Sequence, residues 1–224
     1  MESTTRNYLV VTAGYWAFTI TDGAIRMLVV LYFHMLGYSP LEVATLFLFY
    51  EFFGIVTNLT GGWLGARVGL NRIMNLGMGL QVAALGMLTV PDAWLSVPYV
   101  MAAQALSGIA KDLNKMSAKA SVKTLAGNAD NLFRWVAILT GSKNALKGAG
   151  FFIGAALLSW LGFRGALAVL SATLALVLVA TAIALPADVG KMSYKPTFKQ
   201  VFSNVPAINW PSASRFFLFG SRDA

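Results

Sequence analysis

The sequence predicts an all-α membrane protein with six transmembrane helices and the start of a seventh, and three observations support this. Of 224 residues, 57% are hydrophobic and 12% are charged, about half the charged fraction of a typical soluble domain. Six apolar stretches have the length of a membrane-spanning helix, about 17–25 residues, and none shows the regular strand-length alternation of a β-barrel. Short polar or glycine-bearing connections separate them.

The first three spans are read from the N-terminus. Tyr8–Phe33 is too long for a removable signal peptide and contains two charged residues, so we expect it to be retained. The turn GYSP separates it from Leu41–Thr60, and GGWLGARVGLNR (Gly61–Arg72) leads to Ile73–Val90. The dipeptide Pro-Asp at the start of PDAW (Pro91–Trp94) ends the third span.

The next three spans complete the expected bundle. Trp94–Leu113 is followed by a basic connection, Lys111–Asn131, then by Leu132–Trp160 and Phe163–Leu185, which LGFRG joins. After residue 185 the composition turns polar and proline-bearing, so residues 186–211 are expected to form a cytoplasmic linker. Residues 212–224 begin a seventh span that stops after about a dozen residues, too few to cross a bilayer.

The positive charges predict the orientation. Short cytoplasmic loops are enriched in Lys and Arg, and a cytoplasmic N-terminus leaves only Arg164 on the opposite side. The expected location is therefore the inner membrane, in several passes, and topology accounts for most of the net charge of +8. A nucleic-acid partner is not expected, since no soluble basic domain is present. The cations placed in the cytoplasm are Arg6, Arg67, Arg72, Lys111, Lys115, Lys119, Lys123, Lys191, Lys195 and Lys199.

Two lysines in the fifth span predict a binding site. Lys143 and Lys147 stand one helical turn apart, and Lys143 lies roughly 15 Å into the membrane at about 1.5 Å per residue. A charge there is costly and two like charges repel, so an anion is needed between them. Arg26 adds a third cation and Asn144 completes the expected binding set.

The carboxylates at mid-depth offset only part of this charge. Asp22 stands four residues before Arg26 and is expected to neutralise it, while Glu51 in the second span is free to pair with one lysine. Such a pair would be structural, and that alternative stays open. Three deep cations against two carboxylates leave a positive surplus, which favours an anionic substrate. Either carboxylate could take up a coupling proton, and Glu51 is the preferred candidate.

The basic connection after the fourth span has two interpretations. Its lysines recur every four residues and so share one helical face. They are either an anchor for acidic lipids or a vestibule that attracts anions through Lys111 and Lys115, with Asp112 and Asn114 ordering it. No cofactor or metal is expected, and the absence of GxxxxGK[ST] excludes ATP as the energy source of this chain. A membrane enzyme is disfavoured, because the sole histidine, His34, falls on the outer side.

Two motifs resemble the major facilitator superfamily. GGWLGARVGLNR is similar to the loop between its second and third helices, where a glycine-x-leucine-x-aspartate-arginine-x-glycine signature implies a gating role. Ala66 replaces the aspartate, which removes the ion pair ascribed to that residue. Gly162-Phe163-Arg164 is similar to the turn between the fifth and sixth helices. The matching loop residues are Gly62, Leu64, Arg67, Gly69 and Arg72.

A closer resemblance covers nearly the whole chain. RNYLVVTAGYWAFTITDGAIRMLVV, LFLFYEFFGIVTNLTGGWLGAR, YVMAAQALSGIAKDLNKMSAKASVK, FRWVAILTGSKNALKGAGFF and SRFFLFGSRD resemble the ArsJ family of organoarsenical efflux permeases. That resemblance implies export of 1-arseno-3-phosphoglycerate, made from arsenate by a glyceraldehyde-3-phosphate dehydrogenase, and hence arsenate resistance. Export of another organic phosphate is the alternative.

The same resemblance implies that this chain is one half of a permease. Superfamily members have two six-span halves with the substrate bound between them. Residues 1–185 correspond to the N-terminal half, so a C-terminal half or a second copy of the chain is expected to complete the site. The alternative expectation is that this chain is a non-functional fragment of a permease.

Overall fold

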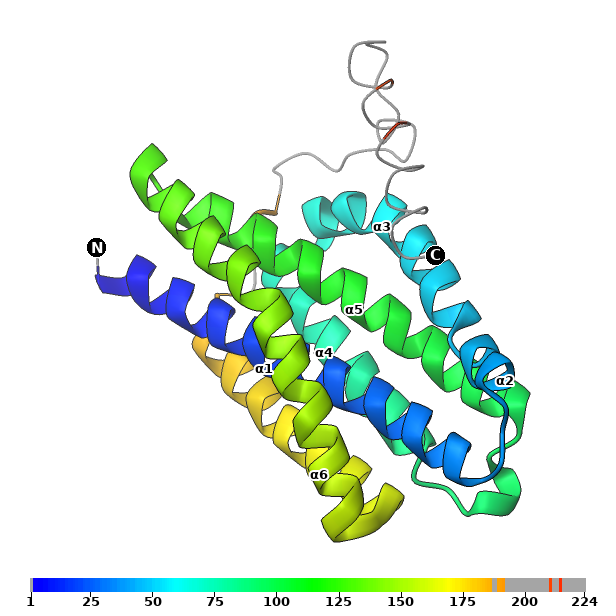
Figure 1. Cartoon of the computed structure of the whole chain (residues 1–224). Coiled ribbons are helices and arrows are strands. Elements are labelled where there is room, and N and C mark those ends of the chain that lie inside the picture. The colour runs from blue at the N-terminus through cyan, green and yellow to red at the C-terminus, as the bar shows by residue number, and fades with distance from the viewer. Residues whose placement is uncertain (1, 187–188, 192–209, 211–213, 215–224) are drawn as a thin grey trace.

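The computed structural model describes residues 2–186, 189–191, 210 and 214. Within this part the chain is helical with no strand (Figure 1). The expected linker at 186–211 and the expected seventh span at 212–224 lie almost wholly outside the described residues. The elements in order are α1 (Glu2–Met35), α2 (Pro40–Thr45), α3 (Leu48–Val68), α4 (Leu70–Met87), the 3₁₀ turn η1 (Asp92–Trp94), α5 (Val97–Leu125) and α6 (Ala129–Ala184).

The six expected spans correspond to these helices. The second span is α2 followed by α3, and Ser39 caps α2 through a capping box with Glu42. The fifth and sixth spans are both in α6, whose path reverses at Gly162 (φ 68°, ψ 179°), a conformation that glycine adopts without strain (Figure 1). The predicted six-helix bundle is confirmed in the described part of the chain.

Not every helix is equally apolar. By length and composition alone, the segments able to cross a membrane are Ser3–Met35, Pro40–Asn58 and Ala129–Ala184. α4 and α5 fall outside this group, since α4 carries Arg72 and Gln81 and α5 carries a series of lysines. Both helices nevertheless belong to the bundle, where α5 packs along α3 and α4.

Two expected connections are helical instead. The segment Gly61–Arg72 belongs mostly to α3 and α4, which only Gly69 (φ 107°, ψ 139°) separates. The segment Lys111–Asn131 is helical as far as Leu125, because alanine and lysine favour helix and no glycine or proline interrupts them before Gly127. Composition predicted loops at both places, and helix propensity extends the helices through them.

Glycines allow three close helix crossings. A Cβ atom at Gly108 of α5 would strike the Tyr50 carbonyl of α3, and one at Gly150 of α6 would strike the Ile20 carbonyl of α1. One at Gly77 of α4 would lie 2.9 Å from the Ala110 carbonyl of α5. Small residues let membrane helices approach in this way, and these crossings bring charged residues from α1, α3, α5 and α6 together.

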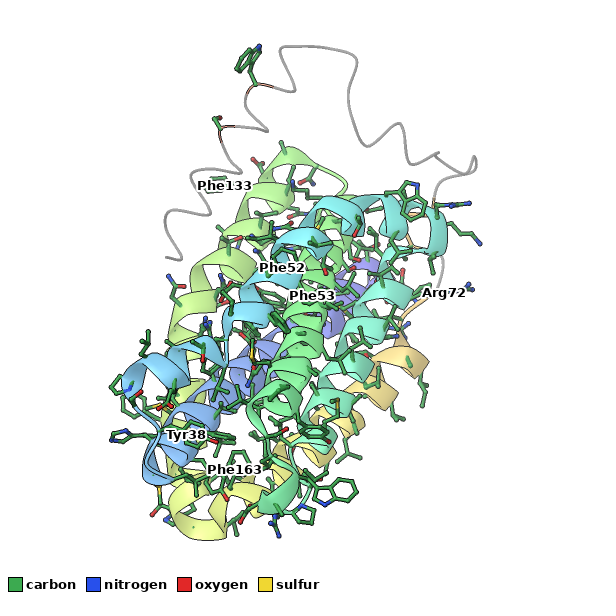
Figure 2. All side chains as sticks on the ribbon, turned by 90° about the vertical axis from the view of Figure 1, so that its right-hand side faces the viewer. Tyr38, Phe52, Phe53, Arg72, Phe133 and Phe163 are labelled. Carbon is green, nitrogen blue, oxygen red and sulfur yellow. The ribbon has the colours of Figure 1, made fainter. Side chains whose placement is uncertain are left out.

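The alternating course of the chain defines two ends of the bundle. At one end, the Tyr32 hydroxyl and the Arg164 guanidinium donate to Asp92 Oδ1 at 2.8 Å and 3.0 Å. At the other, Asn71 Nδ2 donates to the Pro186 carbonyl at 2.7 Å. We call these the Asp92 end and the Asn71 end. Figure 2 shows Phe163 toward the first and Phe133 toward the second.

Candidate functional site

Charged side chains from four helices meet inside the bundle. We define the charge cluster as Asp22 and Arg26 of α1, Glu51 of α3, Lys111, Asp112 and Lys115 of α5, and Lys147 of α6. Most of its members were expected from the sequence. The pairing among them was not.

Glu51 is shared by two cations. Arg26 Nη2 lies 3.1 Å from its Oε1, and Lys111 Nζ lies 3.4 Å from its Oε2. The expectation that Glu51 pairs with Lys143 or Lys147 is wrong, because α3 lies along α5 and its carboxylate meets the cations of α1 and α5 first. The three side chains are 21–34% exposed, so none of them is fully buried within this chain.

Asp22 has a different partner from the one expected. The Tyr50 hydroxyl donates to Asp22 Oδ1 at 2.5 Å, and Asp22 is only 5% exposed. The i,i+4 spacing predicted an Asp22–Arg26 pair, but the long guanidinium reaches across to Glu51 instead. Phe47 and Tyr50 flank it, with Arg26 Cζ 5.5 Å and 4.6 Å from their ring centroids.

Tyr50 connects the Asp22 carboxylate with the cations Arg26 and Lys111, a role that was not predicted from the sequence. Its hydroxyl binds Asp22, while its ring lies 4.6 Å from Arg26 Cζ and 4.1 Å from Lys111 Nζ. The signal was present, since a tyrosine in mid-span beside Glu51 needs a hydrogen-bond partner in an apolar surrounding.

Asp112 holds the next lysines of α5. Its Oδ1 lies 3.3 Å from Lys115 Nζ and its Oδ2 lies 4.0 Å from Lys111 Nζ. A Cβ at Gly54 would come within 2.7 Å of Oδ2, so that glycine leaves space for the carboxylate. Asn114, which we expected to order the same vestibule, is fully buried and turns its amide toward the Met74 carbonyl of α4 instead.

Lys147 is the exception among the cluster cations. Within the described residues its ammonium makes no hydrogen bond and no ion pair shorter than 4.0 Å. It lies within electrostatic range of Asp22, Arg26, Lys111 and Lys143. Asn144 is exposed and stands outside the contacts described for the cluster.

The balance of charge is positive. The cluster holds four cations and three carboxylates, Asp22, Glu51 and Asp112, which leaves one positive charge at ordinary ionisation. Arg26, Lys111 and Lys115 share the carboxylates of Glu51 and Asp112, while Asp22 is bound by the neutral Tyr50 hydroxyl and lies within electrostatic range of Lys147. Lys147 is the cation of the cluster without a direct partner, and we call it the surplus cation. A cluster with a net positive charge attracts anions.

The expected gating residues lie at the Asn71 end. Gly62, Leu64 and Arg67 are in the last turns of α3, Gly69 is the break, and Arg72 is in the first turn of α4. Arg67 Cζ lies 4.9 Å from the Trp63 ring centroid. This corner is a tight helix–helix junction rather than a loop.

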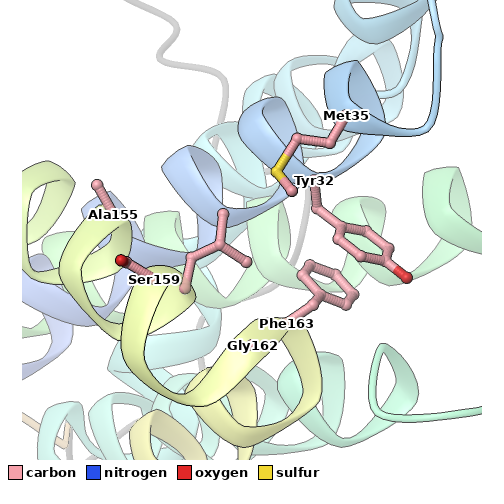
Figure 3. A pocket seen from close by; sticks show the side chains of 7 residues that line it. Tyr32, Met35, Ala155, Ser159, Gly162 and Phe163 are labelled. Atoms are coloured by element: carbon pink, nitrogen blue, oxygen red, sulfur yellow. The ribbon is translucent and has the colours of Figure 1, made fainter.

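The pocket in Figure 3 is separate from the charge cluster. It has a volume of about 440 Å³ and lies at the Asp92 end between α1 and the break in α6. Tyr32 stacks on Phe163 at 4.0 Å beside it, and Met35, Ala155 and Leu158 make it apolar. It offers no charged side chain to an anion.

The bundle encloses ionisable residues from four of its helices, an arrangement that occurs in polytopic membrane transporters. Residues 11–221 match the family model of the Major Facilitator Superfamily, and the chain belongs to this family. A comparison with curated proteins gave no significant match.

Two solved structures share the fold. One comes from work on substrate recognition in proton dependent oligopeptide transporters, with a TM-score of 0.69 and 18% identity over 85% of this chain and 44% of that one. The other is a bacterial homologue of the human drug peptide transporters PepT1 and PepT2, with a TM-score of 0.69 and 18% identity over 96% and 49%. The chain thus spans about half the length of these structures. Family and neighbours point to a transporter rather than an enzyme.

Proposed function

We propose that this chain is the N-terminal half of a secondary active exporter for an anionic phosphate or arsenate ester, of which 1-arseno-3-phosphoglycerate is the favoured substrate. The observation that carries the proposal is the unpartnered ammonium of Lys147 in a cluster whose other charges have partners. An oxyanion at Lys147 would supply the missing counter-charge through charge-assisted hydrogen bonds. The choice of an arsenate ester rests on the resemblance to the ArsJ family.

Glu51 is the proposed proton-coupling residue. It is more accessible than Asp22, whose carboxylate is buried and bound by Tyr50. Protonation of Glu51 would remove the carboxylate that binds Arg26 and one of the two carboxylates near Lys111, which keeps Asp112 at 4.0 Å. The protonation state of this one carboxylate would then change the charge that the site presents to the substrate.

A second six-helix unit would complete the transporter. Alternating access needs two units that move about a shared site at mid-depth, and the described helices supply one wall of it. We propose that a C-terminal half, or a second copy of this chain, forms the opposite wall. The proposed setting is the inner membrane with the N-terminus in the cytoplasm, acting together with a glyceraldehyde-3-phosphate dehydrogenase.

The test uses a complete two-half permease that contains this half. Cells that express it together with the dehydrogenase should grow on arsenate, while Lys147→Ala should abolish resistance at unchanged membrane abundance. Lys191→Ala, which removes a cation remote from the cluster, is the matched control and should keep resistance. Met1–Ala224 alone should give none if a C-terminal half forms the opposite wall, whereas resistance from this chain alone would point to a second copy.

Two results would count against the proposal. Full resistance in Lys147→Ala would show that this ammonium does not meet the substrate. Transport of 3-phosphoglycerate into inside-out vesicles without any effect on arsenate resistance would favour an exporter of ordinary organic phosphates.

A further inference from the structure

Helices α1 and α6 pack side by side, and their register fixes which residues lie level with one another. The Trp16 indole of α1 donates to the Ser142 hydroxyl of α6 at 2.9 Å. Two turns further along α1, a Cβ atom at Gly23 would strike the Lys147 carbonyl oxygen of α6. Because Asp22 directly precedes Gly23, Asp22 and Lys147 lie at the same level of the α1–α6 crossing.

Asp22 is nevertheless bound by a residue of a third helix. The hydrogen bond from the Tyr50 hydroxyl of α3 is 2.5 Å long, within the range of about 2.5–2.7 Å for a hydroxyl that donates to an ionised carboxylate. Tyr50 is fully buried and its ring lies against Arg26 and Lys111, so packing fixes the position of its hydroxyl. Asp22 is thereby held by α3, and Lys147 has no acidic side chain within 4.0 Å in the described part of the chain.

Without the Tyr50 hydroxyl, Lys147 is the cation that Asp22 would meet. The other nearby cation, Arg26, is bound to Glu51 at 3.1 Å and lies 4.6 Å from the Tyr50 ring centroid. Lysine carries its charge on a flexible stem, and rotation about χ1 redirects an aspartate carboxylate. Opposite charges attract strongly in the partly desolvated interior of a membrane bundle. A direct Asp22–Lys147 pair would occupy the ammonium group that the proposed function assigns to the substrate anion.

We propose that Tyr50 is a positioning residue that holds Asp22 away from Lys147 and so keeps the Lys147 ammonium available to an anion. In this arrangement Asp22 is an internal competitor of the substrate, and the Tyr50 hydroxyl suppresses the competition. The inference rests on the proposed function, because it takes Lys147 as the group that meets the substrate. It adds the residue pair that sets how strongly the anion is bound.

The experiment measures the dissociation constant of 3-phosphoglycerate by calorimetry, with the complete two-half permease in nanodiscs of phosphatidylcholine. Tyr50→Phe removes only the hydroxyl and should weaken binding roughly tenfold, because Asp22 then pairs with Lys147. Asp22→Asn can still accept the Tyr50 hydrogen bond and should strengthen binding roughly tenfold. In the Asp22→Asn background, Tyr50→Phe should have no further effect, since the competing carboxylate is absent.

Tyr99→Phe and Asp92→Asn are the matched controls. The Tyr99 hydroxyl donates to a carbonyl of α4 at 2.8 Å and Asp92 forms its ion pair with α6 at the Asp92 end, so these variants remove the same groups outside the cluster. Neither should change the dissociation constant, and an equal change in either would overturn the inference.

The two single variants at the cluster separate a positioning role from a structural one. Loss of packing alone would weaken binding in Tyr50→Phe equally with and without the Asp22 carboxylate, and that result would contradict the inference. Weaker binding in Asp22→Asn would contradict it too. Where Lys147→Ala abolishes binding, an unchanged dissociation constant in Tyr50→Phe would have the same meaning.

A double-mutant cycle of Asp22→Asn and Lys147→Met measures the pair without any substrate. In thermal unfolding of the purified chain, the stabilising coupling between the two residues should be larger in the Tyr50→Phe background than in the wild type, by roughly 2–4 °C in Tm. A coupling that is no larger in Tyr50→Phe would overturn the inference. A larger coupling, together with unchanged 3-phosphoglycerate binding in Lys147→Ala, would support the role of Tyr50 and contradict only the proposed function.

Discussion

Replacing Lys147 and replacing Lys111 by methionine should change stability in opposite directions. Methionine keeps the length and helix propensity of lysine while removing the charge. Lys147 has no hydrogen-bond or ion-pair partner among the described residues, and three of its four charged neighbours are cations. Removing its charge relieves desolvation and the repulsion from Arg26, Lys111 and Lys143, at the loss of the attraction to Asp22 but of no direct contact.

Lys111 has the opposite environment. Its Nζ lies 3.4 Å from Glu51, 4.0 Å from Asp112 and 4.1 Å from the Tyr50 ring centroid, and Lys111→Met removes all three interactions. Breaking a fully buried pair costs about 3–5 kcal/mol and an exposed pair contributes about 0–1 kcal/mol. Since Lys111 and Glu51 are 21% and 34% exposed, we expect an intermediate loss, which we put at about 2 kcal/mol.

The assay is thermal unfolding of the purified chain in detergent at neutral pH. For a chain of this size 1 kcal/mol corresponds to roughly 2–4 °C in Tm, so Lys111→Met should lower Tm by about 4–8 °C. Lys147→Met should raise Tm by about 2–4 °C, which corresponds to about 1 kcal/mol. Added 3-phosphoglycerate should stabilise the wild type more than Lys147→Met. A lower Tm for Lys147→Met, equal to that of Lys111→Met, would refute the assignment of Lys147 as the surplus cation.

Other parts of the fold are tested by three further changes. Gly108→Ala should lower Tm, at a cost of about 1–3 kcal/mol, because the new methyl group meets the Tyr50 carbonyl at the α3–α5 crossing. At the Asp92 end, hydrogen bonds from Tyr32 and Arg164 lower the pKa of the Asp92 carboxyl. The stability that these hydrogen bonds contribute is therefore complete above the pKa of Asp in the unfolded chain, near 3.9, and is lost as the pH falls through the lower pKa of the folded chain. The Tm difference between wild type and Asp92→Asn should accordingly be constant from about pH 5 to 8 and shrink below about pH 4, and a constant difference at low pH would contradict this. Reporter fusions test the orientation: they should be outside after Leu36, Asp92 and Gly162 and inside after Gly69, Gly127 and Lys191, and the reverse pattern would invert it.

The six-helix bundle could be predicted from the sequence, because the length of an apolar segment and the position of a helix-breaking residue are local properties. The glycine at the turn between the fifth and sixth spans, Gly162, marks the reversal of α6 that the structure contains. Helix ends were less predictable, since the lysine-rich part of α5 looks like a loop by composition and remains helical by propensity.

Most residues of the charge cluster could be predicted from the sequence, but the pairs that they form could not. Depth along a span follows from residue number, which placed Glu51 and Lys147 near mid-depth. Pairing depends on which helices are neighbours and how far each side chain reaches, as when Arg26 bypasses Asp22 for Glu51. The role of Tyr50 needs the same knowledge, because its hydroxyl and its ring contact different helices.

The single-residue reversal at Gly162 has a consequence for how the protein is handled. At the Asp92 end, the helices are joined by the short segments 36–39 and 88–96 and by the turn at Gly162, with η1 held against α6 through Asp92 and Arg164. The longest of these segments, 88–96, contains η1 and is tied to α6, so an insertion at this end would disturb a contact between helices. An epitope tag or a cleavage site belongs instead at Ala126–Asn128 on the Asn71 end, where Gly127 (φ 66°) already breaks the helix between α5 and α6.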